Sequence, residues 1–203
     1  IDTTPDQPLN KWSTSTQLAM RERCAQFGIE VEMTHIIGSG NALNDEATGA
    51  IFLRPSDERD RQIDLVCDVI RMAGTAGLRG LNYNITNLGH LRTECSLGRG
   101  GASLSTFDYQ ELVEKGTERE PEETRFSEFQ DGPADDDEMW ERIDYWLQRV
   151  IPVAEEYKVQ MACHPSDPGI GVGKTYRGVA RPLGMVEGFK KLIDLYDLSL
   201  IHI

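Results

Sequence analysis

Two spacings of apolar residues alternate along the chain of 203 residues. Short apolar runs, each about as long as one strand, occupy residues 28–36, 78–85 and 158–164. A stretch in which apolar residues recur every three or four positions, the period of an amphipathic helix, precedes each run. These stretches predict helices over residues 16–27, from Ser56 onward, over residues 134–157 and, after the last run, over residues 184–196.

This alternation of helices and strands is typical of α/β proteins. The apolar runs favour a sheet that is buried on both faces, as in a parallel sheet or a barrel. A closed eight-stranded barrel needs about 250 residues, and the pattern contains three clear strands. We therefore expect an α/β fold that is a partial (β/α)8 TIM barrel with parallel strands, incomplete at both ends.

Composition narrows the function classes. The net charge of −13 disfavours nucleic acid and anionic membranes as partners. No run of about 18 apolar residues is present, so no membrane-spanning helix is expected, and the first residues do not resemble a signal peptide. The four cysteines show no CxxC spacing, which indicates reduced thiols and a cytoplasmic protein.

A long excursion, residues 86–134, follows the second predicted strand, and such excursions are often functional. Its first half contains "RTECSLGRGGASLST", in which Arg92 and Arg99 flank three glycines. Glycines allow a backbone to approach a ligand, and guanidinium groups bind carboxylates with two hydrogen bonds. The motif indicates either a site for an anionic small molecule or a tight surface turn whose arginines pair with Glu94 and nearby acids. We expect its second half to be solvated.

The segment "MACHPSDPG" places His164 at the carboxyl end of the third strand, where α/β barrels keep their chemistry. Neutral imidazole is a common ligand of Mn, Fe and Zn, although a structural loop histidine is the alternative. Asn84 ends the neighbouring strand, so we expect it to face the same space as His164. Cys163 alternates away, toward the helices. Asp167 is interpreted as a turn former and His35 as a structural residue.

Two blocks, residues 83–109 and 161–193, together resemble the mannonate dehydratase family of the xylose-isomerase-like barrel superfamily. The resemblance extends over about residues 28–196. His90, Cys95 and Ser166 depart from the family pattern, which affects the expected substrate specificity. The resemblance implies a lyase that converts D-mannonate to 2-keto-3-deoxy-D-gluconate in glucuronate catabolism, with Mn²⁺ or Fe²⁺ as cofactor, and a possible homo-oligomer at full length.

The family's metal site resembles a set of His, Cys, His and Asp from successive strand ends. By motif match His164 is the first of these, and the other ligands and the acid/base residues are expected downstream of this chain. Arg92, Arg99 and Asn84 are the expected substrate-binding residues. Two other functions stay open. One is a sugar isomerase or epimerase of the same superfamily, which would use Glu32 and Asp167 as ligands, and the other is a non-catalytic sugar-acid binding protein.

The last six residues, "LSLIHI", match a translation of the mosaic end of a transposon used in sequencing libraries. An apolar strand is the alternative interpretation. With the first interpretation, residues 1–197 form the partial barrel domain, residues 198–203 are adapter sequence, and His202 is no ligand. We then expect the chain to be inactive by itself.

Overall fold

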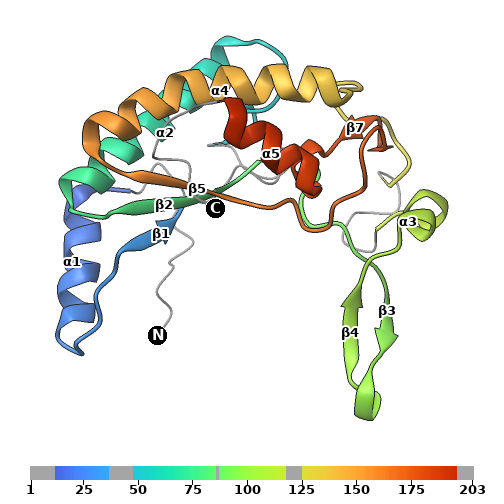
Figure 1. The fold of residues 1–203 in the computed structure, drawn as a ribbon, viewed down its shortest axis with the longest axis horizontal. Coiled ribbons are helices and arrows are strands. Elements are labelled where there is room, and N and C mark those ends of the chain that lie inside the picture. The colour runs from blue at the N-terminus through green and yellow to red at the C-terminus, as the bar shows by residue number, and fades with distance from the viewer. Residues whose placement is uncertain (1–11, 37–47, 86, 118–124, 196–203) are drawn as a thin grey trace.

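The computed structural model describes residues 12–36, 48–85, 87–117 and 125–195, and Figure 1 shows its fold. The helices are α1 (Thr14–Ala25), α2 (Asp57–Thr75), α3 (Tyr109–Lys115), α4 (Asp136–Tyr157) and α5 (Val186–Leu195), with 3-10 turns η2 (Arg99–Gly101) and η3 (Pro182–Gly184). The strands are β1 (Met33–His35), β2 (Gly80–Asn84), β3 (Thr93–Leu97), β4 (Ser103–Thr106), β5 (Gln160–His164), β6 (Thr175–Tyr176) and β7 (Val179–Ala180).

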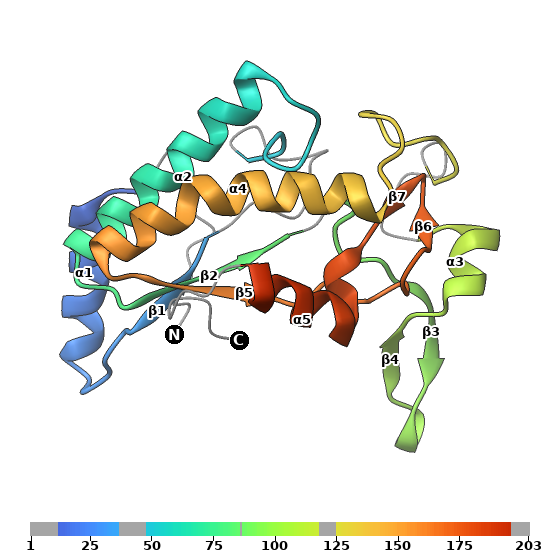
Figure 2. The ribbon, with the colours of Figure 1, turned by 45° about the horizontal axis from the view of Figure 1, so that its top comes forward.

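The three predicted strands form one parallel sheet in the order β1-β2-β5. Helices α2 and α4 run side by side along it in both views (Figures 1 and 2). The α/β class and the parallel sheet are therefore confirmed. The described residues form no closed barrel, and none of their helices is long and apolar enough to cross a bilayer.

Local capping explains where the two long helices begin. The Ser56 side chain accepts a hydrogen bond from the Arg59 amide at 3.1 Å, and acidic residues fill the first turn of α2. Asp135 and Glu138 form a reciprocal capping box at the start of α4. Pro152 lies inside α4, and the helix continues to Tyr157.

The face of the sheet toward α2 and α4 is the main core. Its strand side chains are buried: Leu81, Tyr83, Met161 and Cys163. The Trp146 ring of α4 packs between Tyr83 and Phe52, with centroid separations of 4.8 and 5.7 Å. The expectation that Cys163 faces the helices is confirmed, because it belongs to this core.

The opposite face of the sheet corrects the sequence analysis, which expected both faces to be buried. Parallel register places His35, Asn82, Asn84 and His164 on this face. These residues are half-buried or, for His164, exposed. Their side chains are polar, so a strand that reads as apolar overall still carries one wettable face.

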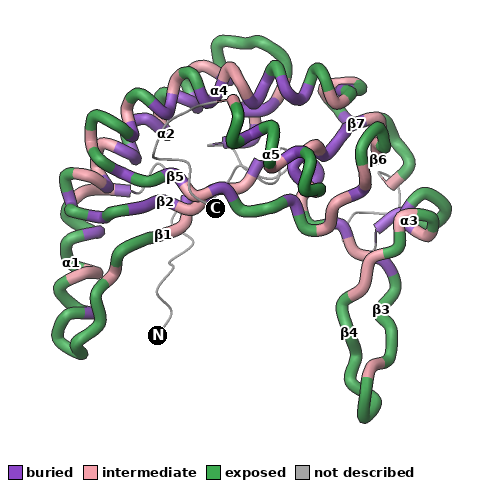
Figure 3. The backbone as a smooth tube through the Cα atoms, in the orientation of Figure 1, coloured by how far each residue is buried: buried purple, intermediate pink, exposed green. Residues whose placement is uncertain are grey.

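The excursion after β2 has its own structure. Strands β3 and β4 form an antiparallel hairpin, which projects away from the sheet (Figure 1) and is mostly exposed (Figure 3). The second half of the excursion was expected to be solvated, and this is wrong for Phe129 and Ala134. Both are buried in a second apolar cluster with Leu91, Leu112 and Val179, because the short hairpin β6–β7 packs over them.

Candidate functional site

The carboxyl ends of β2 and β5 lie side by side and carry the predicted polar pair. Asn84 and His164 are direct register partners of parallel strands, so their side chains point to the same face. The predicted placement of His164 at a strand's carboxyl end, beside Asn84, is therefore confirmed. Their chemical roles stay predictions.

The His164 ring has a defined orientation. Its Nδ1 lies 2.7 Å from the Pro165 carbonyl oxygen, which can only accept, so Nδ1 carries the proton and donates. The lone pair is then on Nε2. This is the arrangement found in metal-binding histidines, whose second nitrogen is held by a backbone carbonyl or a carboxylate. The ring is exposed, so Nε2 is accessible to a ligand.

His35 lies on the same face at the end of β1, but its ring is already used. Its Nδ1 lies 2.8 Å from Oδ1 of Asn82, its register partner on β2. Asn82 in turn donates to the Ala162 carbonyl of β5 at 3.3 Å. This chain of bonds ties the three strands together, which suits the structural role interpreted from the sequence.

Arg92 lies near the same edge and is mostly covered, with 19% of its side chain exposed. Its Nη2 donates to Asp167 Oδ2 at 2.5 Å, and its Nε donates to the Ser105 hydroxyl at 3.0 Å. Asp167 belongs to the loop that follows His164, and its backbone carbonyl accepts from His90 at 3.4 Å. The ion pair joins two segments that are 75 positions apart.

Arg99 is separated from Arg92. It begins the η2 turn at the tip of the β3–β4 hairpin, whereas Arg92 directly precedes β3 at the base (Figure 1). Gly100 and Gly101 have positive φ values, and a Cβ added to either would meet nothing within 4 Å. The glycines therefore serve a tight, exposed turn. The structure does not bring the two arginines together, and a role for Arg99 in binding stays a prediction.

Arg181 was missed by the sequence analysis. It follows β7, is only 4% exposed, and lies close enough to Asp167 and Arg92 for both charges to act on it. Burial lowers the pKa of its guanidinium to about 10, while Asp167 opposes that shift. A charged residue inside the apolar segment "VARPL" was the available signal.

A metal site is incomplete in the described part of the chain. No group of three or more His, Cys, Asp or Glu side chains there is arranged to hold an ion. His164 fits as one ligand, through Nε2. Cys163 does not fit, because it faces the helices and burial raises the pKa of its thiol to about 12. Metal ligands must be deprotonated, so no reaction step is derived through a metal here.

The cysteines give a direct test of this geometry. At pH 8 we expect a water-soluble aromatic disulfide reagent to label exposed Cys95 rapidly in the folded chain, and Cys163 only after denaturation. A pKa of about 12 leaves about one Cys163 thiol in ten thousand ionised at that pH. The released chromophore measures labelling, and Cys95→Ser is the control that should remove the fast phase. Rapid labelling of Cys163 would contradict its burial.

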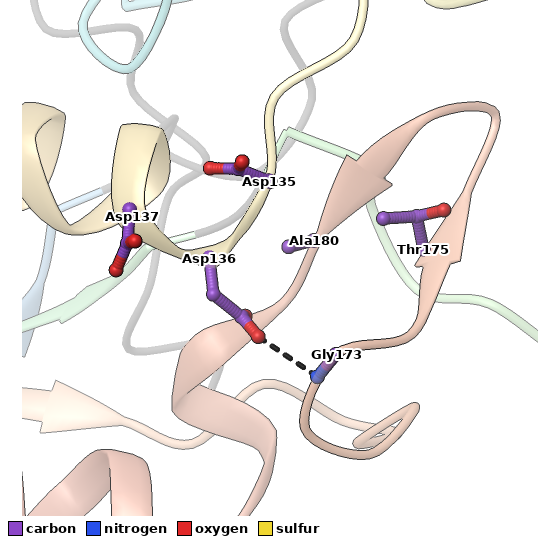
Figure 4. A pocket seen from close by; sticks show the side chains of 6 residues that line it. All are labelled: Asp135, Asp136, Asp137, Gly173, Thr175 and Ala180. Carbon is purple, nitrogen blue, oxygen red and sulfur yellow. Dashed lines mark hydrogen bonds between the residues drawn. The ribbon is translucent and has the colours of Figure 1, made fainter.

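An acidic pocket at the start of α4 has a structural explanation. Three consecutive carboxylates line it together with Gly173, Thr175 and Ala180 (Figure 4): Asp135, Asp136 and Asp137. The Asp136 carboxylate accepts from the Gly173 amide at 2.8 Å, and Asp135 caps the helix. These contacts hold the β6 turn against α4.

The ligands required by an isomerase are not together. Glu32 lies just before β1 and pairs with Arg79 at 3.0 Å. Asp167 follows the carboxyl end of β5, and the strands are parallel. The two carboxylates therefore lie at opposite ends of the sheet, so this geometry does not favour the isomerase alternative.

Fold and site together define a class of protein. A parallel sheet with helices on one face, and with histidine, asparagine and arginine side chains gathered at its carboxyl edge, is an α/β protein with a candidate ligand site where parallel α/β proteins bind ligands.

Comparison with known proteins gives the family. A sequence model of the family described as D-mannonate dehydratase (UxuA) matches residues 3–201, and the chain belongs to this family. The mannonate dehydratase of Lachnoclostridium phytofermentans is 29% identical over 92% of the chain and 55% of the relative. That of Enterococcus faecalis is 26% identical over 94% of the chain and 56% of the relative.

A solved structure shows the same fold. The mannonate dehydratase from Streptococcus suis serotype 2 matches with a TM-score of 0.70 and 22% identity, covering 96% of this chain and 51% of that one. The chain thus spans about half the length of the relatives that it matches end to end.

Proposed function

We propose that the chain is part of an enzyme that removes water from D-mannonate to give 2-keto-3-deoxy-D-gluconate. The family match over residues 3–201 is the observation that carries this proposal. The carboxyl-edge geometry supports it, because it combines an accessible imidazole nitrogen with cationic groups suited to a sugar acid.

The reaction has two demands that the protein must meet. The hydrogen on C2 is weakly acidic, because the adjacent carboxylate is already negative, and the 3-hydroxyl is a poor leaving group. A bound Mn²⁺ or Fe²⁺, held in part by His164, would supply Lewis acidity toward the carboxylate and the neighbouring hydroxyl. An acid would assist departure of the 3-hydroxyl. We expect that acid in the half of the relatives' length that this chain does not span.

The remaining site residues have proposed roles in binding. Arg92, held at the sheet edge by Asp167, offers a guanidinium to the substrate carboxylate. Asn84, in register with His164, offers an amide to a substrate hydroxyl. Arg99 lies at the hairpin tip and would reach a substrate only if the hairpin lies over the site in the complete protein.

The finer description of the fold is part of this proposal. Three parallel strands with helices on one face and polar side chains on the other match an arc of a (β/α)8 barrel, whose helices form the outer ring. A cytoplasmic location and a homo-oligomer at full length also remain proposals.

The test uses a joined protein, in which residues 1–197 are followed by the downstream half of the Streptococcus suis enzyme. With Mn²⁺ it should form 2-keto-3-deoxy acid from D-mannonate, and a chelator should abolish this activity until metal is restored. Conversion of sugars without loss of water would indicate an isomerase instead. Failure to convert D-mannonate, with a folded protein and bound metal, would contradict the proposal.

A further inference from the structure

Arg181 is a buried cation with unused hydrogen-bonding groups. It is 4% exposed, and within the described residues its Nε and Nη1 have no hydrogen-bond partner. A buried charged donor without an acceptor is strongly unfavourable. Such an arrangement persists in a folded protein when a ligand supplies the missing acceptor or when function requires the strain.

The other arginines buried in the described residues have acceptors of their own. Arg142 pairs with Asp131 at 3.0 Å and donates to the Phe52 carbonyl. Arg59 pairs with Asp60 at 3.5 Å and stacks 4.0 Å from the centre of the Tyr145 ring. Arg181 differs from both, since no ion pair or ring contact is found for it in the described residues.

The nearest carboxylate is already engaged. Asp167 attracts Arg181, but it pairs directly with Arg92, whose charge acts against that of Arg181. Two guanidinium groups therefore share one carboxylate, and the cluster carries an excess positive charge in a protein whose net charge is −13. One further carboxylate would balance the cluster.

Backbone contacts fix Arg181 relative to the His164 loop. The Ser166 amide donates to the Leu183 carbonyl at 3.1 Å. Gly169 and Gly184 approach so closely that a Cβ on Gly169 would lie 2.0 Å from the Gly184 carbonyl oxygen. The segment carrying Arg181 is thus packed against the loop that begins at His164, so a ligand of Arg181 would lie beside the predicted metal ligand.

We propose that Arg181 binds the carboxylate of the sugar acid, together with Arg92, and that Asp167 holds Arg92 in place for this role. The substrate class rests on the proposed function, but the requirement for a carboxylate rests on the unpaired guanidinium itself. Arg181 is then a substrate-binding residue that positions the acid next to His164.

The experiment titrates the 203-residue chain, without metal, with D-mannonate, D-gluconate and D-mannitol at neutral pH and low salt, followed by NMR. Mannitol lacks the carboxylate and serves as the ligand control. The variants are Arg181→Met and Arg181→Lys, and Arg59→Met is the matched control in another buried arginine. Thermal unfolding by circular dichroism confirms that each variant is folded.

We expect both acids to bind and mannitol not to bind. Arg181→Met should weaken acid binding about 10- to 100-fold, which corresponds to the loss of charged hydrogen bonds. Arg181→Lys should recover part of the affinity, because an ammonium keeps the charge but not the planar fork. Arg59→Met should stay within about twofold of the unchanged chain.

Unchanged acid binding in both Arg181 variants, equal binding of mannitol, or no acid binding by the unchanged chain would overturn the proposal. These outcomes are distinct from failure of the proposed function. If the joined protein does not dehydrate mannonate but acid binding depends on Arg181, the function is wrong and the site stands. If dehydration proceeds with an unaltered Michaelis constant in the joined Arg181→Met protein, the function stands and the site is wrong.

Discussion

The His164→Ala variant of the joined protein is expected to lose bound metal and at least about 100-fold of its dehydration rate, because even outer contacts of metal ligands contribute 10- to 100-fold. The hydrogen bond from Nδ1 to the Pro165 carbonyl leaves the Nε2 lone pair available at an exposed position. Alanine removes that lone pair and leaves the core untouched, since His164 is exposed and Cys163 carries the packing at this end of β5.

His35→Ala is the matched control for this loss. Both histidines end strands of one sheet and point to the same face, but the His35 ring is bound to Asn82. Its removal should lower the midpoint of urea unfolding and leave the metal content of the folded protein near that of the unchanged protein. Metal analysis by mass spectrometry and the rate of keto-deoxy acid formation check both variants. Full metal content in His164→Ala would exclude this residue as a ligand.

The strands and long helices were predictable because their signals are local. Ser56 and Asp135 cap helices through bonds to residues three positions away, and the helical period follows from one face packing on the sheet. The polar face of the sheet was also present in the sequence, in Asn82, Asn84 and His164. It was read as apolar because averaging over a short run hides a period of two.

The carboxyl-edge cluster was predictable only in part. His164 and Asn84 could be placed together because parallel strands end at the same edge. The pairing of Arg92 with Asp167 spans 75 positions and depends on the path of a hairpin excursion, which no local pattern records. Arg181 was missed for the same reason. Its importance lies in a missing partner, and the absence of a partner becomes visible only when the neighbours are placed.

The chain of 203 residues, expressed as it stands, is expected to bind Mn²⁺ weakly and to show no measurable dehydration of D-mannonate. Its described residues present one imidazole and no group of three side chains that could hold an ion. The family match places it beside relatives of about twice its length. General acid and base catalysis contributes about 10²- to 10⁴-fold to such reactions, and no described side chain is assigned that task.

The sheet adds a second reason for this expectation. Strands β1 and β5 are the outer strands of the described sheet, and Met33 on β1 is 45% exposed. Unpaired strand edges favour association with other chains, so the isolated chain should also elute from a sizing column earlier than the joined protein relative to its mass. Both proteins are assayed side by side with D-mannonate and Mn²⁺. Turnover by the 203-residue chain would show that its own residues include the acid and base, and would move the search for them to the carboxyl-edge cluster around His164 and Arg181.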